Sequence, residues 1–259
     1  MARSGNLIHV AATAAFIVGG IAFALDPQSE AQLAALNGHG GVMLTLDPRA
    51  ILPLDEPNLT YLFLNPANPV MWALLVALWI LLALDAAGQW LDPSDAGLRQ
   101  WLHGPSAGQP AWPPLAMALA LTAIWPWFLA PAPWIAAAGA TAAAGAAFVA
   151  ALRGSGQRRP TIGFFAGWSL AVAAAANAIP LARAIGLPMT QVAILTMLPT
   201  AILGVAAQLR IGREIGFSIA VIWAFCGVAA TTMGVDPVIA LAAILGIAAM
   251  AGVLVSVAT

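Results

Sequence analysis

The side chains that could do chemistry in this chain are few and stand far apart. Its three histidines, His9, His39 and His103, are isolated, the first at the edge of an apolar run and the others in loops. A lone histidine near a helix end can bind the metal of a tetrapyrrole, but no second ligand lies at helical spacing here. The sequence has no paired carboxylates, no nucleophile beside a base, no phosphate-binding loop and no cluster of metal ligands. We therefore expect that the protein is not an enzyme and has no metal site.

Two polar side chains lie within long apolar runs. Asp85 stands near one end of such a run, and we expect it to reach the membrane interface. Asn177 is flanked by alanines, and an amide in that setting needs a hydrogen-bond partner on another helix or on a ligand. Gln191, Thr196 and Thr200 of the next apolar run are the candidate partners. Asn177 is therefore a candidate ligand-binding residue.

Ten tryptophans are many for 259 residues, and their depth in the predicted helices divides them. Seven fall near the ends of apolar runs, where an indole keeps its ring in the acyl boundary and its N–H in water. Trp79, Trp168 and Trp223 lie deeper. An indole N–H at that depth needs a partner. The ring either packs internally or forms the wall of a site for a flat hydrophobic ligand, and the sequence leaves both alternatives open.

Composition determines the surroundings of these side chains. Hydrophobic residues make up 62% of the chain and charged residues only 7%, against about 25% in a soluble domain. Such a chain has no polar shell to offer water, so lipid must surround most of its surface. The net charge of −1 excludes the basic face that nucleic acid requires. The single cysteine, Cys226, excludes an internal disulfide and a cysteine-based metal site.

Apolar runs of about 18 residues or more predict an all-α, polytopic membrane helix bundle, with residues 1–259 in one integral membrane domain. We expect about eight transmembrane helices, at residues 6–25, 69–90, 113–130, 133–152, 161–180, 188–208, 214–233 and 237–257. The third and fourth are short, so they form a tight hairpin or one of them does not fully cross. The first run, which ends near Ala22 and Ala24, also suits a secretory signal, but we expect it to be retained as the first membrane helix.

The arginines predict the orientation of these helices. With the N-terminus inside, seven arginines fall in inner segments and only Arg49 and Arg183 in outer segments. Both termini are then cytoplasmic, in a multi-pass protein of the bacterial inner membrane. Residues 26–68 become a long outer, periplasmic loop that covers the membrane surface or docks a neighbour. Residues 92–112 become an inner interfacial loop with aromatic anchors.

Small residues at helical spacing predict where helices approach closely. Gly163 and Gly167 form one such stripe, and Gly216 and Gly227 belong to a second stripe two apolar runs later. Stripes of this kind let two helix backbones come together. The two helices therefore pack on each other, or each packs on the alanine-rich run at residues 136–147.

Two stretches of the chain resemble a known family. GFFAGWSLAVAAAAN, at residues 163–177 after an Arg-Arg-Pro turn, is similar to the "AGW…AT..N" helix of the bacterial tryptophan-rich sensory proteins, the long form of the TspO/MBR family. REIGFSIAVIWAFCGV, at residues 213–228, resembles a later helix of the same form. The resemblance covers residues 161–228, and the family's earlier "AFAIWG" motif has only a loose counterpart at residues 69–79.

This resemblance implies a helical membrane protein, often a dimer, that is associated with tetrapyrroles, sterols or other flat apolar ligands and with stress or photosynthesis regulation. Trp168 and Asn177 match the family's tryptophan and asparagine, Trp223 matches the tryptophan of the later helix, and Trp79 matches loosely. The residues nonetheless differ in direction. Trp168 and Asn177 are nine residues apart, or about 180° around a straight helix, and so cannot face the same partner.

We therefore expect a TspO-like membrane protein that binds a flat hydrophobic ligand in a sensory or regulatory role. Trp168, Trp223 and Trp79 would form its walls, with Asn177 as a polar anchor. The ligand itself is unknown, and a tetrapyrrole, a carotenoid or a lipid bound without a covalent link would each suit such walls. The alternative is an accessory subunit of a larger respiratory or photosynthetic membrane complex. Membrane lipids are the expected partners, together with a second copy in a homodimer or a larger complex, and nucleic acid is not expected.

Overall fold

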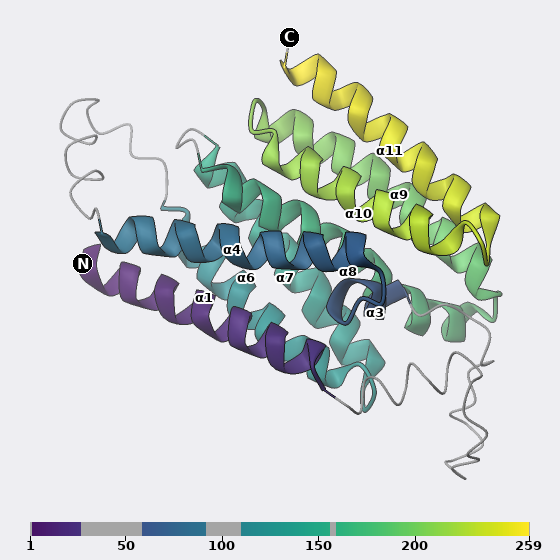
Figure 1. Ribbon diagram of the computed structural model, residues 1–259, viewed down its shortest axis with the longest axis horizontal. Coiled ribbons are helices and arrows are strands. Elements are labelled where there is room, and N and C mark those ends of the chain that lie inside the picture. Colours follow the sequence, from purple (N-terminus) through teal and green to yellow (C-terminus); the bar gives the residue numbers. More distant parts are fainter. Residues whose placement is uncertain (1, 27–58, 92–109, 156–158, 259) are drawn as a thin grey trace.

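The computed structural model describes residues 2–26, 59–91, 110–155 and 159–258, and all regular structure in them is helical (Figure 1). In chain order the helices are α1 (Ala2–Ala24), α3 (Leu59–Leu64), α4 (Pro69–Leu91), α6 (Trp112–Ile124), the 3-10 helix η1 (Trp125–Phe128), α7 (Pro133–Gly154), α8 (Pro160–Ile185), α9 (Met189–Ile211), α10 (Gly216–Thr232) and α11 (Pro237–Ala258). Most of the two predicted loops, 26–68 and 92–112, lies outside the described residues.

Six of these helices, α1, α4, α7, α8, α9 and α11, are long and apolar enough to cross a membrane. This confirms the prediction of an all-α membrane bundle, although eight such helices were expected. The predicted run 113–130 is not one long helix, because Pro126 has no N–H to continue the ladder after α6 and the chain tightens into η1. Helix α10 has 17 residues, or about 26 Å of length, against a hydrocarbon core of about 30 Å.

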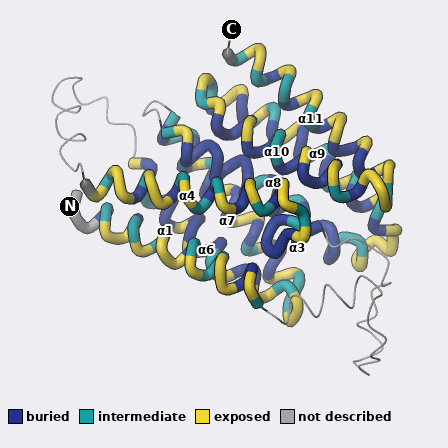
Figure 2. The backbone as a smooth tube through the Cα atoms, viewed as in Figure 1, coloured by how far each residue is buried: buried dark blue, intermediate teal, exposed yellow. Residues whose placement is uncertain are grey.

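Helix α8 is the centre of the bundle. In its most apolar window 83% of the residues are buried, against 33% in both α1 and α4. Helices α7, α9 and α10 pack directly on α8, and α11 packs on α9 and α10. Helices α1, α4 and α6 form the other side of the bundle, and Figure 2 shows their outward faces exposed while the segments next to α8 are buried.

Glycines let the backbones of α8 and α10 meet. A Cβ added to Gly163 would lie 3.2 Å from the backbone nitrogen of Phe217, and one added to Gly167 would lie 3.0 Å from the Ala220 Cβ and closer still to the Phe217 carbonyl. Gly216 faces the start of α8 equally closely. The small stripes of α8 and α10 thus pack on each other. Gly227, by contrast, faces α4, where the Met71 side chain occupies the space beside it.

Asp236 caps the N-terminus of α11. Its Oδ1 accepts hydrogen bonds from the backbone N–H groups of Val238 and Ile239, at 3.1 and 3.3 Å, and Pro237 fills the first helical position, where no N–H is needed. The Thr190 hydroxyl at the start of α9 donates to Oδ2, so the cap also ties α11 to α9. The Thr190 hydroxyl and these N–H groups lower the pKa of Asp236.

Candidate functional site

The face of α1 that points into the bundle carries an ordered row of side chains. His9, Thr13, Phe16 and Phe23 follow one another at intervals of four, three and seven residues, which places them on one side of the helix. His9 is fully buried, and Thr13, Phe16 and Phe23 are at most 7% exposed. The half of this face nearer the N-terminus is polar and meets α4. The other half is aromatic and meets α8, α3 and η1.

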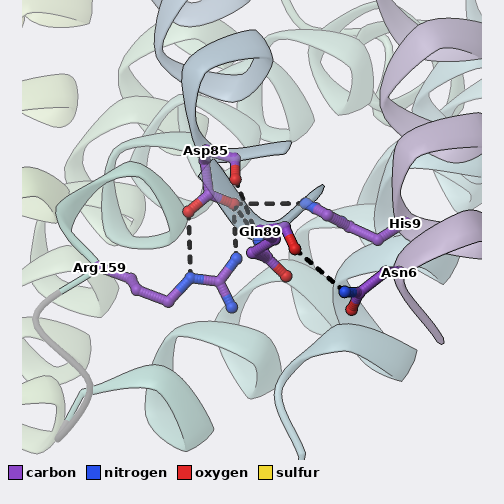
Figure 3. A network of polar contacts seen from close by, with 5 residues as sticks. All are labelled: Asn6, His9, Asp85, Gln89 and Arg159. Atoms are coloured by element: carbon purple, nitrogen blue, oxygen red, sulfur yellow. Dashed lines mark hydrogen bonds and ion pairs between the residues drawn. The ribbon is translucent and has the colours of Figure 1, made fainter. Parts of the chain in front are cut away.

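The polar half belongs to a five-residue network, the Asp85 cluster: Asn6, His9, Asp85, Gln89 and Arg159 (Figure 3). Arg159 donates from Nε to Oδ1 of Asp85, at 3.0 Å, and from Nη2 to Oδ2. Gln89 Nε2 donates to the same Oδ2 at 2.8 Å, and His9 Nε2 lies 3.3 Å from it. Asn6 Nδ2 donates to the Gln89 carbonyl at 3.0 Å. One carboxylate thus joins α1, α4 and the residue before α8.

The electrostatics of the cluster centre on Asp85 and Arg159, whose side chains are 9% and 18% exposed. Two parallel N–H···O bonds give this pair the geometry that best offsets the loss of hydration. Arg159 is the N-cap residue of α8, and Pro160 follows it at the first helical position. We expected Asp85 to extend to the interface, but the carboxylate is turned inward and fully engaged.

The aromatic half of α1 lines a cavity of about 20 Å³, which is room for about one water molecule. We call it the Trp cavity. Phe16, Gly19, Gly20 and Phe23 of α1 form one wall, and the remaining lining residues are Leu64, Leu75, Trp79, Thr122, Ala123, Pro126 and Trp168. Helices α1, α3, α4, α6 and α8 and the 3-10 helix η1 therefore all contribute to it.

Packing holds the two indoles of the Trp cavity in place. The Trp168 ring is stacked on Phe165, with ring centroids 6.2 Å apart, and meets Phe16 edge-on at 5.8 Å. Trp79 lies against Gly20, where an added Cβ would come within 3.1 Å of the indole nitrogen. A Cβ at that position would require the Trp79 ring to shift away from α1 by a few tenths of an ångström.

Both indole N–H groups of the Trp cavity lack a hydrogen-bond partner within the protein, although both nitrogens are buried. A buried donor left in this state costs about 1–3 kcal/mol, so the two together would cost roughly 2–6 kcal/mol. That is a large part of the 5–15 kcal/mol by which a typical domain is stable. Buried polar groups are therefore normally paired, by water or by a bound molecule. In a cavity of this size, a water molecule or one polar group of a bound molecule would pair them.

The other two predicted ligand-binding residues lie elsewhere. Trp223 of α10 donates its N–H to the Val70 carbonyl at 3.1 Å and packs edge-on against Phe164. Asn177 donates to the Thr141 hydroxyl of α7 at 2.9 Å and to the carbonyl of Ala173. The structure thus brings together Trp79 and Trp168 but not Trp223 or Asn177.

The expected partners of Asn177 in the next helix, Gln191, Thr196 and Thr200, are wrong. Asn177 lies on the side of α8 that faces α7, and Thr200 instead donates back to the Thr196 carbonyl of its own helix. The opposite directions expected for Trp168 and Asn177 agree with their partners, because Trp168 contacts α1 while Asn177 contacts α7.

Sequence reasoning missed His9, Phe16 and Gly20 as neighbours of the site, and Arg159 as the partner of Asp85. A signal was present in each case. His9, Phe16 and Gly20 have the spacing of a single helix face. Asp85 and Arg159 both stand at the predicted inner ends of their apolar runs, where opposite charges on neighbouring helices can pair.

The described part of the chain has no group of three histidine, cysteine or carboxylate side chains that could hold a metal ion. Comparisons with family models, with curated proteins and with solved structures gave no match to this chain. Its function therefore has to be inferred from the Asp85 cluster and the Trp cavity themselves.

Proposed function

We propose that this chain is a multi-pass membrane protein that binds a flat hydrophobic molecule at the Trp cavity, in a TspO-like sensory or regulatory role. One observation carries the proposal: two deep indoles from different helices, Trp79 and Trp168, line the same cavity with their N–H groups unpaired. Apolar walls with a few fixed hydrogen-bonding groups are typical of ligand sites. A tetrapyrrole, a carotenoid or a lipid would each offer such walls a large apolar surface.

The cavity is much smaller than the roughly 300–1,000 Å³ of a site for a small organic molecule. A flat ligand therefore requires that the helices around the cavity separate. Gly20, Trp79 and Ala123 at its edge are only half-buried, so the shortest way in leads from the lipid-facing surface beside α1. The ligand would enter from the membrane and not from water.

We further propose that α10 and the unit formed by α6 and η1 also cross, which gives eight crossings with both termini in the cytoplasm of a bacterial inner membrane. The bias of the arginines supports this orientation. The contacts between helices support it as well. Asn6, Gln89 and Arg159 lie together at one end of the bundle, which is the predicted inner side. Thr190 at the start of α9 is hydrogen-bonded to Asp236 just before α11, and the proposed crossings place both on the outer side.

A porphyrin titration tests the binding site. The purified protein is titrated with protoporphyrin IX, and binding is followed by the absorbance of the porphyrin. We expect saturable binding, weakened about three- to tenfold by Trp79→Phe or Trp168→Phe because a smaller ring loses stacking area and the N–H donor. Trp223→Phe is the matched control, since Trp223 lies outside the cavity and its N–H is already paired. Equal affinity in all three variants would show that the Trp cavity is not the site.

Purification from native membranes in mild detergent, followed by pigment and lipid analysis, addresses the same proposal without a chosen probe. A co-purifying flat apolar molecule that is lost in Trp168→Phe supports it. A stoichiometric partner protein with no such molecule would instead support an accessory subunit of a larger respiratory or photosynthetic complex.

A further inference from the structure

The α1 and α4 walls of the Trp cavity are less buried than the α8 wall. Helix α1 supplies four of the lining residues, more than any other helix. Only 33% of its apolar window is buried, whereas α8, on the opposite side, is held at 83%. Because α8 is packed closely against α7, α9 and α10, the cavity opens most readily where α1 and α4 separate.

The Asp85 cluster holds α1 in place on the same face that lines the cavity. His9 and Gly20 are eleven residues apart, which is about 20° around the helix and about 16 Å along it. A stiff helix transmits a movement of His9 directly to Gly20 and Phe16. The position of His9 against Asp85 and the width of the Trp cavity are therefore coupled through the α1 backbone.

The contacts within the cluster are unequal. The Arg159 pair is doubly hydrogen-bonded and connects α4 to the start of α8 without involving α1. The α1 contacts are the 3.3 Å approach of His9 to Asp85 and the single hydrogen bond from Asn6 to the Gln89 carbonyl. Releasing α1 therefore leaves the buried ion pair intact. The Asp85–Arg159 pair therefore stabilises the folded bundle, whereas the His9 and Asn6 contacts can break without disturbing that pair.

We propose that His9 and Asn6, seated on the Asp85 cluster, form a latch that holds the Trp cavity closed and so regulates access of the hydrophobic ligand. This inference rests on the proposed function, because it takes the Trp cavity to be the binding site. In the latched state α1 lies against α4 and α8 and the cavity admits about one water molecule. In the released state α1 moves away from α4 as one stiff helix, and the ligand enters between the two helices.

Oxygen access to the two indoles tests the latch without any ligand. The protein is labelled with 5-fluorotryptophan, and the signals of Trp79, Trp168 and Trp223 are assigned from their Trp→Phe variants. Dissolved molecular oxygen then relaxes each ¹⁹F signal according to how easily it reaches that ring. We expect His9→Leu to raise this relaxation at least threefold at Trp79 and Trp168 and to leave Trp223 unchanged.

A cross-link that replaces the Asn6 contact, and that can be made with His9 and Asp85 kept, supplies the reverse test. In a Cys226→Ser background, Asn6→Cys and Gln89→Cys are joined by a short bis-maleimide, which ties α1 to α4 where they already touch. We expect the cross-link to return oxygen access in His9→Leu to the original level. In the chain that keeps His9, it should slow protoporphyrin IX association at least tenfold. This second arm needs no substitution of His9, so it stands even if His9→Leu does not fold.

The outcomes separate the latch from the proposed function. If oxygen access to Trp168 is unchanged in His9→Leu, or rises equally at Trp223, the latch is wrong whether or not porphyrin binds. If the cross-link leaves the rate of porphyrin association unchanged, the latch is again wrong while the binding site stands. If oxygen access to Trp79 and Trp168 rises in His9→Leu and falls on cross-linking, but no variant binds porphyrin, the latch controls the cavity and the proposed ligand class is wrong.

Discussion

Substituting Gly167 by alanine is the sharpest test of how α8 and α10 meet. The added methyl group would lie 3.0 Å from the Ala220 Cβ, 3.2 Å from the Phe217 carbonyl carbon and closer still to its oxygen. Ordinary van der Waals contact begins at about 3.4 Å. Two of these atoms are backbone, so no side-chain rotation relieves the overlap and the two helices must separate along their seam.

The expected loss follows from two opposing effects. Overpacking in a well-filled interior costs about 1–3 kcal/mol, and a clash with backbone falls at the upper end of that range. Alanine in place of glycine returns roughly 0.5–1 kcal/mol through a smaller loss of backbone entropy. We therefore expect Gly167→Ala to lower the free energy of unfolding by about 2 kcal/mol. Gly163→Ala should cost less, because its nearest contact is 3.2 Å.

Gly145→Ala is the matched control, since a Cβ at Gly145 of α7 meets nothing within 4 Å. It should leave stability unchanged or raise it by up to about 1 kcal/mol. Reversible unfolding in mixed micelles of increasing SDS content, followed by tryptophan fluorescence, measures all three variants. The reasoning is refuted if Gly167→Ala and Gly145→Ala unfold at the same SDS content, because the two backbones then cannot be in contact.

Three further predictions use the same protein. Asp85→Asn should lower the free energy of unfolding by about 1.5–3 kcal/mol, because it removes the charged partner of the partly buried Arg159 guanidinium. Adding Arg159→Gln should recover part of that loss, and a double-mutant cycle without coupling would contradict the pair. Asp236→Ala should cost about 1 kcal/mol as a lost N-cap. Because the folded-state pKa of Asp236 is lowered, its pH-dependent contribution to stability is complete above the ordinary value of 3.8 and is lost as the pH falls through the lowered value. Asp236→Asn keeps a hydrogen-bond acceptor and should weaken this acid dependence in unfolding experiments from about pH 6 to about pH 3. An unchanged dependence would show that other groups cause it. In a cysteine-free chain, Gly234→Cys should react with an impermeant maleimide that is added outside intact cells. Ser155→Cys should react only after the cells are permeabilised. Reaction of both cysteines from the same side of the membrane would exclude the proposed crossings.

Hydropathy located the helices well because lipid constrains length and composition together. The run 237–257 corresponds to α11 at Pro237–Ala258, and the run 188–208 to α9 at Met189–Ile211. The exception is the run 113–130, where the apolar signal continues through Trp125–Phe128 although the backbone geometry changes. Hydropathy is averaged over a window and does not register the loss of a single backbone N–H. Pro126 is therefore the residue in this run that indicates the end of the α-helix.

The directions of side chains were harder to predict than the helices. Trp79, Trp168 and Trp223 share depth and residue type, yet only the first two share a cavity. The partner of Asn177 depends on which neighbouring helix its face of α8 contacts. The sequence of α7 does not indicate which of its own faces packs on α8, because α7 is alanine-rich on every side. A small residue accepts contact from any direction, so periodicity carries little information about facing in such helices.

The Asp85 cluster was predictable in a way that the Trp cavity was not. Seven of the nine arginines fall in the predicted inner segments, so a carboxylate at an inner end of a membrane run is expected to pair with one of them. The Trp cavity depends instead on a glycine, Gly20, whose role is visible only once Trp79 is placed against it. The spacing of Gly20 from His9 and Phe16 shows which face of the helix it shares, but not that Trp79 lies against it.

The two sides of the bundle are held by different kinds of contact, and this difference bears on which helix would move if a ligand binds as proposed. On the α10 side, Gly167 and Gly216 bring backbone against backbone, and such a seam cannot open by small steps without losing all of its packing. On the α1 side, His9 and Asn6 make a few polar contacts at one end, and aromatic rings surround a small cavity toward the other. Rings and polar side chains can part and close again at the cost of a few contacts. Movement upon binding is therefore expected in α1, with α8 and α10 as the fixed reference against which it can be measured.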